Sequence, residues 1–280
     1  MAVVVVTDSS ASLPPEILDE LGIAVVPLHI LVGDQALREG IDPVAIDYAS
    51  DTVTTSAASP GELRAVYEQA LERSGGDGVV AVHLSRQLSG TWEAGRQAVR
   101  DMGADGTIRL VDSLGAGLAT GLPVLAAARQ ARRNAPLAAV HDTAVATAAR
   151  ARTFILVNRT EQLRRSGRLS SAASFFGSEL VTKPLLQMVE GRLELREKVR
   201  TRSKAYTKLV AAAVDAAGAD GAAVAVQHLG AAEAADTIAG RLRELVPGIG
   251  ELLVAEFGPA LAVHLGLGSV GVLVVPGGCG

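Results

Sequence analysis

The sequence predicts an α/β protein of two domains: an N-terminal α/β domain with a parallel sheet over residues 1–150, and a C-terminal α+β domain with a mixed or antiparallel sheet over residues 151–280. In the first part, short apolar runs rich in β-branched residues alternate with helical segments. This pattern is typical of a parallel sheet covered on both faces. In the second part, the turn Glu190-Gly191 separates two extended runs and indicates a hairpin among helices.

The elements of the first part are read from apolar runs and from helix start and stop signals. The run at residues 2–6 predicts a buried strand, and Pro14-Pro15-Glu16 opens a helix that Gly22 ends. Ser59 and Glu62 have the spacing of a capping box, so a helix begins there. The other elements expected are strands at 23–31, 78–84 and 108–112, a short helix at 42–48, a loop at 52–59, and helices from 91, over 117–133 and ending with 143–150.

The elements of the second part mix strands with helices. We expect strands at 153–157, 183–189, 192–198, 222–228, 251–256 and 270–275, and helices at 160–166, 204–217 and 231–245. Neither an internal repeat nor a low-complexity linker is visible in the sequence. The boundary between the domains is therefore placed near residue 150, where the pattern changes.

Polar clusters follow three of the predicted parallel strands. They are residues 7–10, residues 85–91 and the pair Asp112-Ser113. Ligands of open α/β sheets bind beyond the carboxyl ends of the strands, so these clusters are expected to meet at one ligand site.

Composition excludes several classes of protein. A net charge of −4 and 3% aromatic residues argue against nucleic-acid binding. The single cysteine, Cys279, rules out a disulfide framework, and the five histidines lack the paired spacing of a metal site. The N-terminus has no basic segment, and the weakly polar stretch at 114–128 is too short to span a bilayer. A cytoplasmic location without stable membrane insertion is expected.

The segment from Gly266 to Gly271 matches the pattern GxGxxG of dinucleotide-binding proteins. That fingerprint needs a helix and a βαβ unit after it, but only nine residues follow Gly271 and most of them form an apolar run. Nucleotide binding is excluded on this ground. The glycines are better explained by close approach of the backbone to another element or to a ligand.

Ser89 has three possible roles. It could be the nucleophile of a triad with Asp8 and His264, although no GxSxG elbow is present. It could cap the helix that follows, or it could help to bind a carboxylate at the N-terminus of that helix.

Other polar residues also have structural and functional interpretations. His264 stands in an apolar segment and could be a satisfied core residue, and Thr54-Thr55-Ser56 could be a turn that satisfies its own backbone. The arginines at 164, 165, 168, 200 and 202 could be solvated. On an acidic protein, such a basic group is also a candidate for binding an anionic ligand or an acidic partner.

Short motifs occur along the whole chain in a characteristic order. They are Val6-Thr7-Asp8-Ser9-Ser10 with Leu13-Pro14, Thr55-Ser56 with Ser59-Pro60, Leu88-Ser89-Gly90-Thr91, Val111-Asp112-Ser113, Arg165-Ser166-Gly167-Arg168-Leu169-Ser170, Lys183-Pro184-Leu185, Val199-Arg200-Thr201-Arg202-Ser203-Lys204-Ala205, and Gly258-Pro259 with His264. Their order and spacing resemble the DegV family, whose best-understood members are the fatty-acid-binding subunits of bacterial fatty acid kinase. In one departure, Ala57-Ala58 stands where family members often have Gln-Pro.

The resemblance implies a fatty acid lying between the two domains, with its acyl chain in an apolar tunnel. Its carboxylate would be held by the hydroxyls of Thr55, Ser56 and Ser89, with His264 at the same polar end. Gly90 and Thr91 belong to the same binding loop. Arg168, Arg200 and Arg202 would contact the ligand head group or the partner kinase.

The resemblance also implies a lipid-binding protein without catalytic residues, metal or cofactor. The ATP-binding subunit of fatty acid kinase would be its partner and would phosphorylate the bound acid to an acyl phosphate for phospholipid synthesis. Two alternatives stay open at this point. One is a serine-dependent acyl hydrolase, and the other is a carrier of a different apolar carboxylate, such as an isoprenoid acid.

Overall fold

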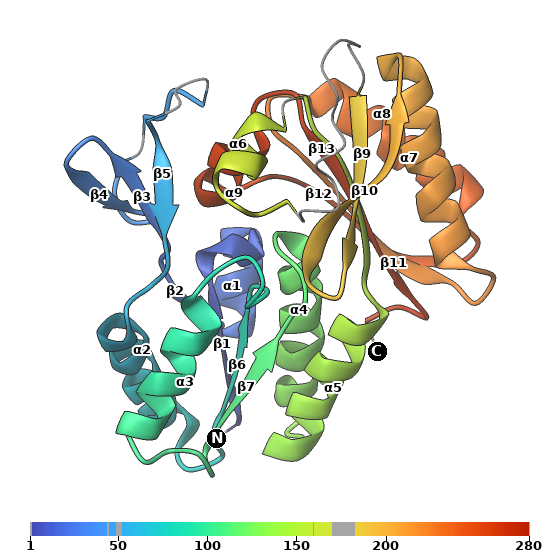
Figure 1. Ribbon diagram of the computed structural model, residues 1–280. Helices are drawn as coiled ribbons and strands as arrows, with labels where there is room; N and C mark the ends of the chain where they lie inside the picture. Colours follow the sequence, from blue (N-terminus) through green and yellow to red (C-terminus); the bar gives the residue numbers. More distant parts are fainter. Residues whose placement is uncertain (1, 44, 49–51, 159, 170–182, 280) are drawn as a thin grey trace.

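The computed structural model describes residues 2–43, 45–48, 52–158, 160–169 and 183–279. In these residues the first part of the chain forms a parallel sheet and the second part a mixed sheet, with a small antiparallel sheet beside them (Figure 1). The predicted fold class is therefore confirmed. Among the described residues, no helix combines the length and the apolar character needed to cross a bilayer.

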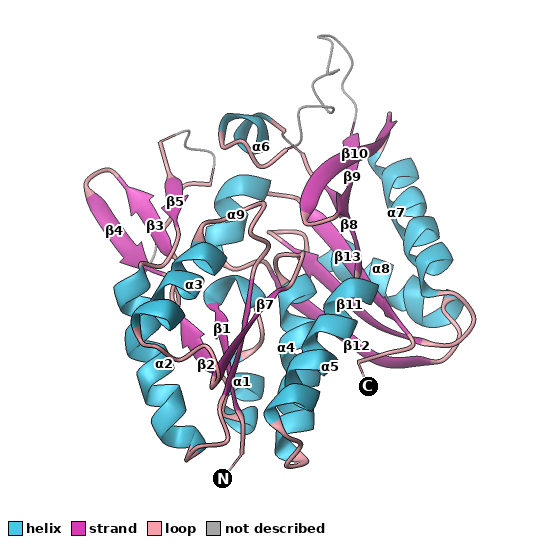
Figure 2. Cartoon of the chain, turned by 60° about the horizontal axis from the view of Figure 1, so that its bottom comes forward, coloured by secondary structure: helices cyan, strands magenta, loops and turns pink. Residues whose placement is uncertain are grey.

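The parallel sheet has the strand order β2-β1-β6-β7. Its strands are β1 (Val4–Asp8), β2 (Ala24–Val26), β6 (Val79–His83) and β7 (Ile108–Asp112). Every residue of β1 and β6 is buried, as expected for central strands covered on both faces. One face packs against α2 (Pro60–Ser74) and α3 (Thr91–Asp101), and the other against α4 (Leu118–Arg132) and α5 (Leu137–Arg150) (Figure 2). Helix α1 (Pro15–Leu21) packs against α4.

The small sheet corrects three sequence predictions. It consists of β3 (His29–Val32), β4 (Gln35–Arg38) and β5 (Thr54–Ser56). The single strand expected at 23–31 is two strands in different sheets, because Pro27 lacks the N–H that would continue the ladder from β2. The loop expected at 52–59 contains β5, which pairs with β3. The helix expected at 42–48 is absent, since none of its described residues is helical.

The mixed sheet has the strand order β10-β9-β8-β13-β11-β12, and only β11 and β12 run parallel to each other. Its strands are β8 (Arg152–Leu156), β9 (Lys183–Val189), β10 (Arg192–Val199), β11 (Ala222–His228), β12 (Ile249–Glu256) and β13 (Val270–Pro276). Strands β9 and β10 form the expected hairpin, in which Glu190 and Gly191 both have positive φ.

The two parts of the chain share one hydrophobic core. Helices α7 (Arg202–Ala217) and α8 (Ala232–Leu245) cover one face of the mixed sheet. On the other face, Ala223, Ala225 and Leu273 belong to the same buried cluster as the apolar residues of α4. The domain boundary near residue 150 stays a prediction, and the halves on either side of it are joined through this buried cluster.

Helices α6 (Glu161–Arg165) and α9 (Pro259–Leu265) lie between the mixed sheet and the small sheet (Figure 1). The expected helix at 160–166 corresponds to α6, whereas α9 was not expected. The GxGxxG segment follows α9 and opens no helix: Gly266 caps α9, and Gly271 already lies in β13. A Cβ on Gly271 would come within 3.1 Å of the Phe257 ring, so close packing explains this glycine.

Candidate functional site

A cavity of about 110 Å³ lies where the small sheet, the parallel sheet and the mixed sheet meet. Its polar wall contains Thr55, Ser56, Ser89, Gly90, Arg168 and His264. Its apolar wall includes Leu84, Ile155, Leu163, Met188, Leu193, Phe257 and Leu265. The cavity is therefore amphipathic, and segments from both halves of the chain form it.

Thr55 and His264 form a hydrogen-bonded pair at the polar end. Strand β5 presents Thr55 opposite Ile30 of β3, and the last turn of α9 presents His264. The Thr55 Oγ1 and His264 Nε2 atoms are 2.7 Å apart, and which atom donates depends on the histidine tautomer. In the tautomer where Nε2–H donates, the threonine hydroxyl keeps its own hydrogen for another acceptor.

Burial lowers the pKa of His264 to about 4, and the positive charge of Arg168 acts in the same direction. The imidazole is consequently neutral at neutral pH. A neutral imidazole can position a hydroxyl or donate one hydrogen bond to a carboxylate, but it adds no positive charge to the site.

Ser89 and Gly90 stand at the N-terminus of α3. Gly90 is the N-cap, so Ser89 lies one residue earlier than a simple capping role requires. The Ser89 Oγ accepts a hydrogen bond from the backbone N–H of Thr91 at 3.3 Å and lies 3.0 Å from the Thr91 hydroxyl. Thr91 itself is fully buried, and these two contacts hold the Ser89 hydroxyl in position. The end of the helix and its positive dipole face the cavity, which favours an anionic group there.

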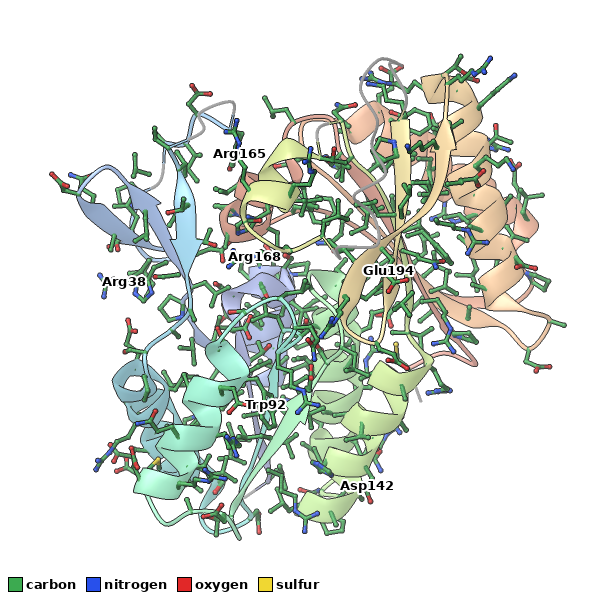
Figure 3. The ribbon with its side chains drawn as sticks, viewed as in Figure 1. Arg38, Trp92, Asp142, Arg165, Arg168 and Glu194 are labelled. Atoms are coloured by element: carbon green, nitrogen blue, oxygen red, sulfur yellow. The ribbon has the colours of Figure 1, made fainter. Side chains whose placement is uncertain are left out.

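Arg168 supplies the positive charge of the cavity. It follows α6, and its guanidinium donates to the backbone oxygens of Leu88 and Ser166. Figure 3 shows Arg168 near the level at which the two halves of the molecule meet. Because Leu88 immediately precedes Ser89, the guanidinium lies beside the other polar groups of the cavity.

The structure brings together six of the nine residues expected in the site. Thr91 is not in the cavity wall but contacts Ser89. Arg200 and Arg202 are exposed and do not line the cavity. Both residues come after the last residue of β10, Val199. The first residue of that strand, Arg192, is the one close to the cavity loop, where its guanidinium donates to the Gln87 side chain.

The triad of a serine hydrolase is not assembled in the described residues. His264 is bonded to Thr55, Ser89 to Thr91, and Asp8 to His83. A histidine whose pKa is about 4 is also poorly matched to the role of a general base at neutral pH.

Comparison with known proteins places the chain in a family. The sequence model of DegV proteins, described as uncharacterised proteins of that family, matches residues 2–277. This chain belongs to the DegV family. A DegV domain-containing protein of Mycobacterium tuberculosis, Rv2417c, is 41% identical over 274 residues, which are 98% of this chain and 97% of that protein.

Solved structures of DegV proteins have the same fold. A DegV family protein of Thermus thermophilus, described by its fatty acid binding, superposes with a TM-score of 0.90 at 28% identity and covers 99% of this chain and 100% of its own. DegV of Bacillus subtilis, described as a fatty acid binding protein, superposes with a TM-score of 0.84 at 31% identity, over 98% of this chain and 99% of its own.

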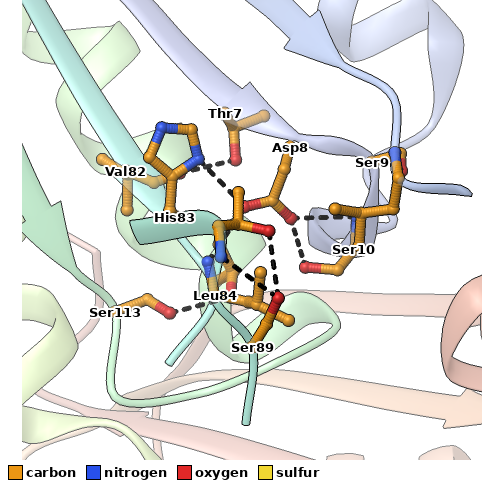
Figure 4. A network of polar contacts seen from close by, with 12 residues as sticks. Thr7, Asp8, Ser9, Ser10, Val82, His83, Leu84, Ser89 and Ser113 are labelled. Atoms are coloured by element: carbon orange, nitrogen blue, oxygen red, sulfur yellow. Dashed lines mark hydrogen bonds and ion pairs between the residues drawn. The ribbon is translucent and has the colours of Figure 1, made fainter. Parts of the chain in front are cut away.

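In this member of the DegV family, a buried polar network holds the start of the loop that carries Ser89 (Figure 4). The Asp8 carboxylate contacts His83 Nδ1 at 3.0 Å and accepts from the backbone N–H of Leu84 at 3.0 Å. The other nitrogen of His83 is 2.7 Å from the Tyr67 hydroxyl. All three side chains are fully buried, so the strand ends that begin the loop are held in one geometry.

The carboxyl ends of β1, β6 and β7 meet at this network, at one edge of the parallel sheet. Besides the contact of Asp8 with Leu84, the backbone N–H of Ser113 donates to His83 at 3.0 Å. Of the three clusters, only residues 85–91 line the cavity, so a ligand site shared by all three stays a prediction. Sequence reasoning missed Tyr67 and His83, because a tyrosine on a helix and a histidine within an apolar strand carry no local signal of their pairing.

Glu39 is a further residue that sequence reasoning missed. Its carboxylate accepts from the backbone N–H of Ala260 at 2.9 Å, at the start of α9, and from the Ser9 hydroxyl. Burial raises the pKa of Glu39. This carboxylate links the end of β4 to the helix that carries His264, and thereby helps to fix the distance between His264 and Thr55.

Proposed function

We propose that this protein binds a long-chain fatty acid, with its carboxylate and first carbons in the amphipathic cavity, and presents it to a partner kinase that phosphorylates the carboxylate to an acyl phosphate. The observation that carries the proposal is that one cavity has both a polar end and an apolar wall. The fatty acid binding named for the related DegV structures supports the same ligand class.

The polar end has the groups that a buried carboxylate needs. An unpaired carboxylate is costly to bury, and several donors must surround it. Ser56, Ser89 and Thr55 offer hydroxyls, the N-terminus of α3 offers backbone N–H groups, and Arg168 balances the charge. His264 holds the Thr55 hydroxyl in place through their hydrogen bond. Because its pKa is lowered to about 4, it is neutral at neutral pH and adds no charge to the site.

The apolar wall matches an alkyl chain. Each buried methylene contributes about 0.8 kcal/mol, so the wall supplies most of the affinity and the polar end fixes the orientation. This arrangement leaves the carboxylate near Ser56 at the end of β5 and Gly90 at the start of α3, both of which are exposed. A second protein can reach the carboxylate from that side, and binding itself requires no cofactor.

A basic surface beside the cavity supports docking of an acidic partner. The guanidinium groups of Arg86 and Arg96 lie 5.6 Å and 5.9 Å from the centre of the Trp92 ring. Arg192 extends the same surface through its bonds to Gln87. Arg86 also pairs with Asp112 at 3.4 Å and Arg96 with Glu93 at 2.7 Å. The excess of positive charge on this surface is therefore small, and it favours a partner with an acidic surface and a phosphate-bearing substrate.

Ligand binding is tested on purified protein. Extraction with organic solvent followed by mass spectrometry should identify a fatty acid, and added palmitate should bind to stripped protein. The double variant Ser56→Ala, Ser89→Ala should weaken palmitate binding by at least tenfold, since hydrogen bonds to charged groups contribute about 1.5–3 kcal/mol each. Its affinity for palmityl alcohol should change much less.

The exposed Ser203, at the start of α7, gives the control Ser203→Ala, which should bind palmitate like the unmodified protein. Failure of the protein to bind any acyl acid would refute the proposal. Preferential binding of an isoprenoid acid over palmitate would identify a carrier of another apolar carboxylate.

The kinase step needs its own assay. With ATP and a fatty acid kinase, the loaded protein should yield an acyl phosphate that hydroxylamine traps as a hydroxamate. The variant Arg86→Glu should slow this reaction and make it less sensitive to salt, while palmitate affinity is retained. An unchanged rate of acyl phosphate formation in Arg86→Glu would exclude the basic surface around Trp92 as the docking site.

A further inference from the structure

Met188 of β9 lies in the wall of two separate cavities. One is the candidate site, with a volume of about 110 Å³, and the other has a volume of about 400 Å³. Among the described residues, Met188 is the one that lines both. Its side chain therefore forms part of the partition between them.

The first cavity is too small for a whole long-chain acid. A cavity of about 150 Å³ holds one benzene ring, and the candidate site measures about 110 Å³. It accommodates a carboxylate and the first carbons of a chain. Palmitate has more than twice as many carbons as benzene, so the rest of the chain needs space beyond this cavity.

The second cavity offers that space. One part of its wall consists of small and apolar residues from the end of α5, the start of β8 and the segment before and within α4: Ala148, Ala149, Ala151, Phe154, Leu114 and Ala119. The other part carries polar and charged residues: Ser113, Arg152, Thr153, Gln187, Glu190 and Arg196. Methylene groups can lie against the apolar part of this wall. Its volume is almost four times that of the first cavity.

The backbone around Met188 is held in place, and its half-buried side chain packs against the cluster that includes Ile155 and Leu163. At the tip of the hairpin, the Ser85 hydroxyl donates to the Gly191 carbonyl oxygen at 2.8 Å, and a Cβ on Gly191 would come within 2.3 Å of that hydroxyl. Met188 pairs with Leu193 across the hairpin and is only half-buried. Methionine has three rotatable side-chain bonds and adapts to irregular spaces.

We propose that Met188 sets the acyl-chain length that this protein accepts, by closing the first cavity to short chains and swinging aside to let long chains enter the second. This inference rests on the proposed fatty-acid binding. A shorter side chain at this position joins the two cavities permanently, and a larger rigid one separates them.

The test compares binding of laurate and stearate to stripped protein carrying Met188→Ala or Met188→Phe. In Met188→Ala the preference for stearate over laurate should rise about tenfold or more, because two additional buried methylenes correspond to about one power of ten in affinity. In Met188→Phe the preference should fall below that of the unmodified protein.

Met102→Ala provides the matched control, since Met102 is also half-buried but packs at the opposite end of α3. It should leave the preference unchanged. Equal preferences in all variants, with both acids still bound, would overturn the role of Met188 while leaving fatty-acid binding intact. If the unmodified protein bound neither acid, the proposed function would instead be refuted.

A photoreactive probe locates the chain directly. Palmitate with a diazirine at its methyl end should crosslink to residues 148–154 in the unmodified protein, and this crosslink should disappear in Met188→Phe. Crosslinks confined to other segments in both proteins would overturn the proposal.

Discussion

Replacing His264 by glutamine should flatten the dependence of stability on pH between about 4 and 6.5. Burial lowers the pKa of His264 from its ordinary value of 6.5 to about 4 in the folded protein. As the pH falls through this range, the unfolded chain takes up a proton at this residue and the folded chain does not. Acidification therefore favours unfolding, and stability is lost as the pH falls.

The magnitude follows from the size of the shift. A pKa lowered from 6.5 to about 4, at 1.36 kcal/mol per unit, gives a loss of about 3 kcal/mol between pH 7 and pH 4. Glutamine cannot titrate but can still hydrogen-bond Thr55. Other groups, including Glu39 with its raised pKa, act equally in both proteins and cancel in the difference.

Urea unfolding at several pH values, followed by circular dichroism, measures this difference. The stability advantage of the unmodified protein over His264→Gln should shrink by about 3 kcal/mol from pH 7 to pH 4. A constant difference across the range would refute the assignment of a neutral, buried histidine. Bound palmitate should raise the pKa of His264, because a nearby negative charge favours the imidazolium.

Three further changes test the surroundings of the site by urea unfolding. Gly117→Ala should destabilise the protein by about 2 kcal/mol or more. The reason is that φ of Gly117 is +67° and the new Cβ would come within 2.3 Å of the Gln227 Oε1. The control Gly106→Ala places its Cβ in open space and should change the stability little. Tyr67→Phe should cost about 1–3 kcal/mol, since it leaves the fully buried His83 Nε2 without its hydroxyl partner. Ser59→Ala removes one half of the capping box of α2 and should cost about 1 kcal/mol.

The parallel sheet could be predicted because the apolar composition of its central strands requires them to be buried. Strands β1 and β6 are continuous apolar runs, and such runs have one stable environment, the middle of a sheet covered on both faces. Polar residues at the ends of those runs then necessarily meet at one edge of the sheet. The position of Ser89 relative to Asp8 follows from this rule alone.

The small sheet and α9 could not be predicted in the same way. Strand β5 is Thr-Thr-Ser, without apolar alternation, and is a strand only because β3 supplies its partner. Helix α9 has seven residues, too few to show a helical period, and its start is fixed by Glu39, which is 221 residues away in the chain. Tertiary contacts decide both elements, so the pairing of Thr55 with His264 rested on the family resemblance.

The way in which the halves are joined limits how a ligand can leave. The Gln227 side chain of β11 accepts from the N-terminus of α4 at 2.7 Å, and Ser85 holds the tip of the β9–β10 hairpin. The same buried cluster includes residues of both halves, so separating them would expose apolar surface at about 25 cal/mol per Å². Entry and release are therefore easier by movement of side chains and loops in the cavity wall than by opening of the halves. Exchange of palmitate should then be faster in Met188→Ala, whose wall offers less obstruction, while the urea midpoint of the whole chain changes far less.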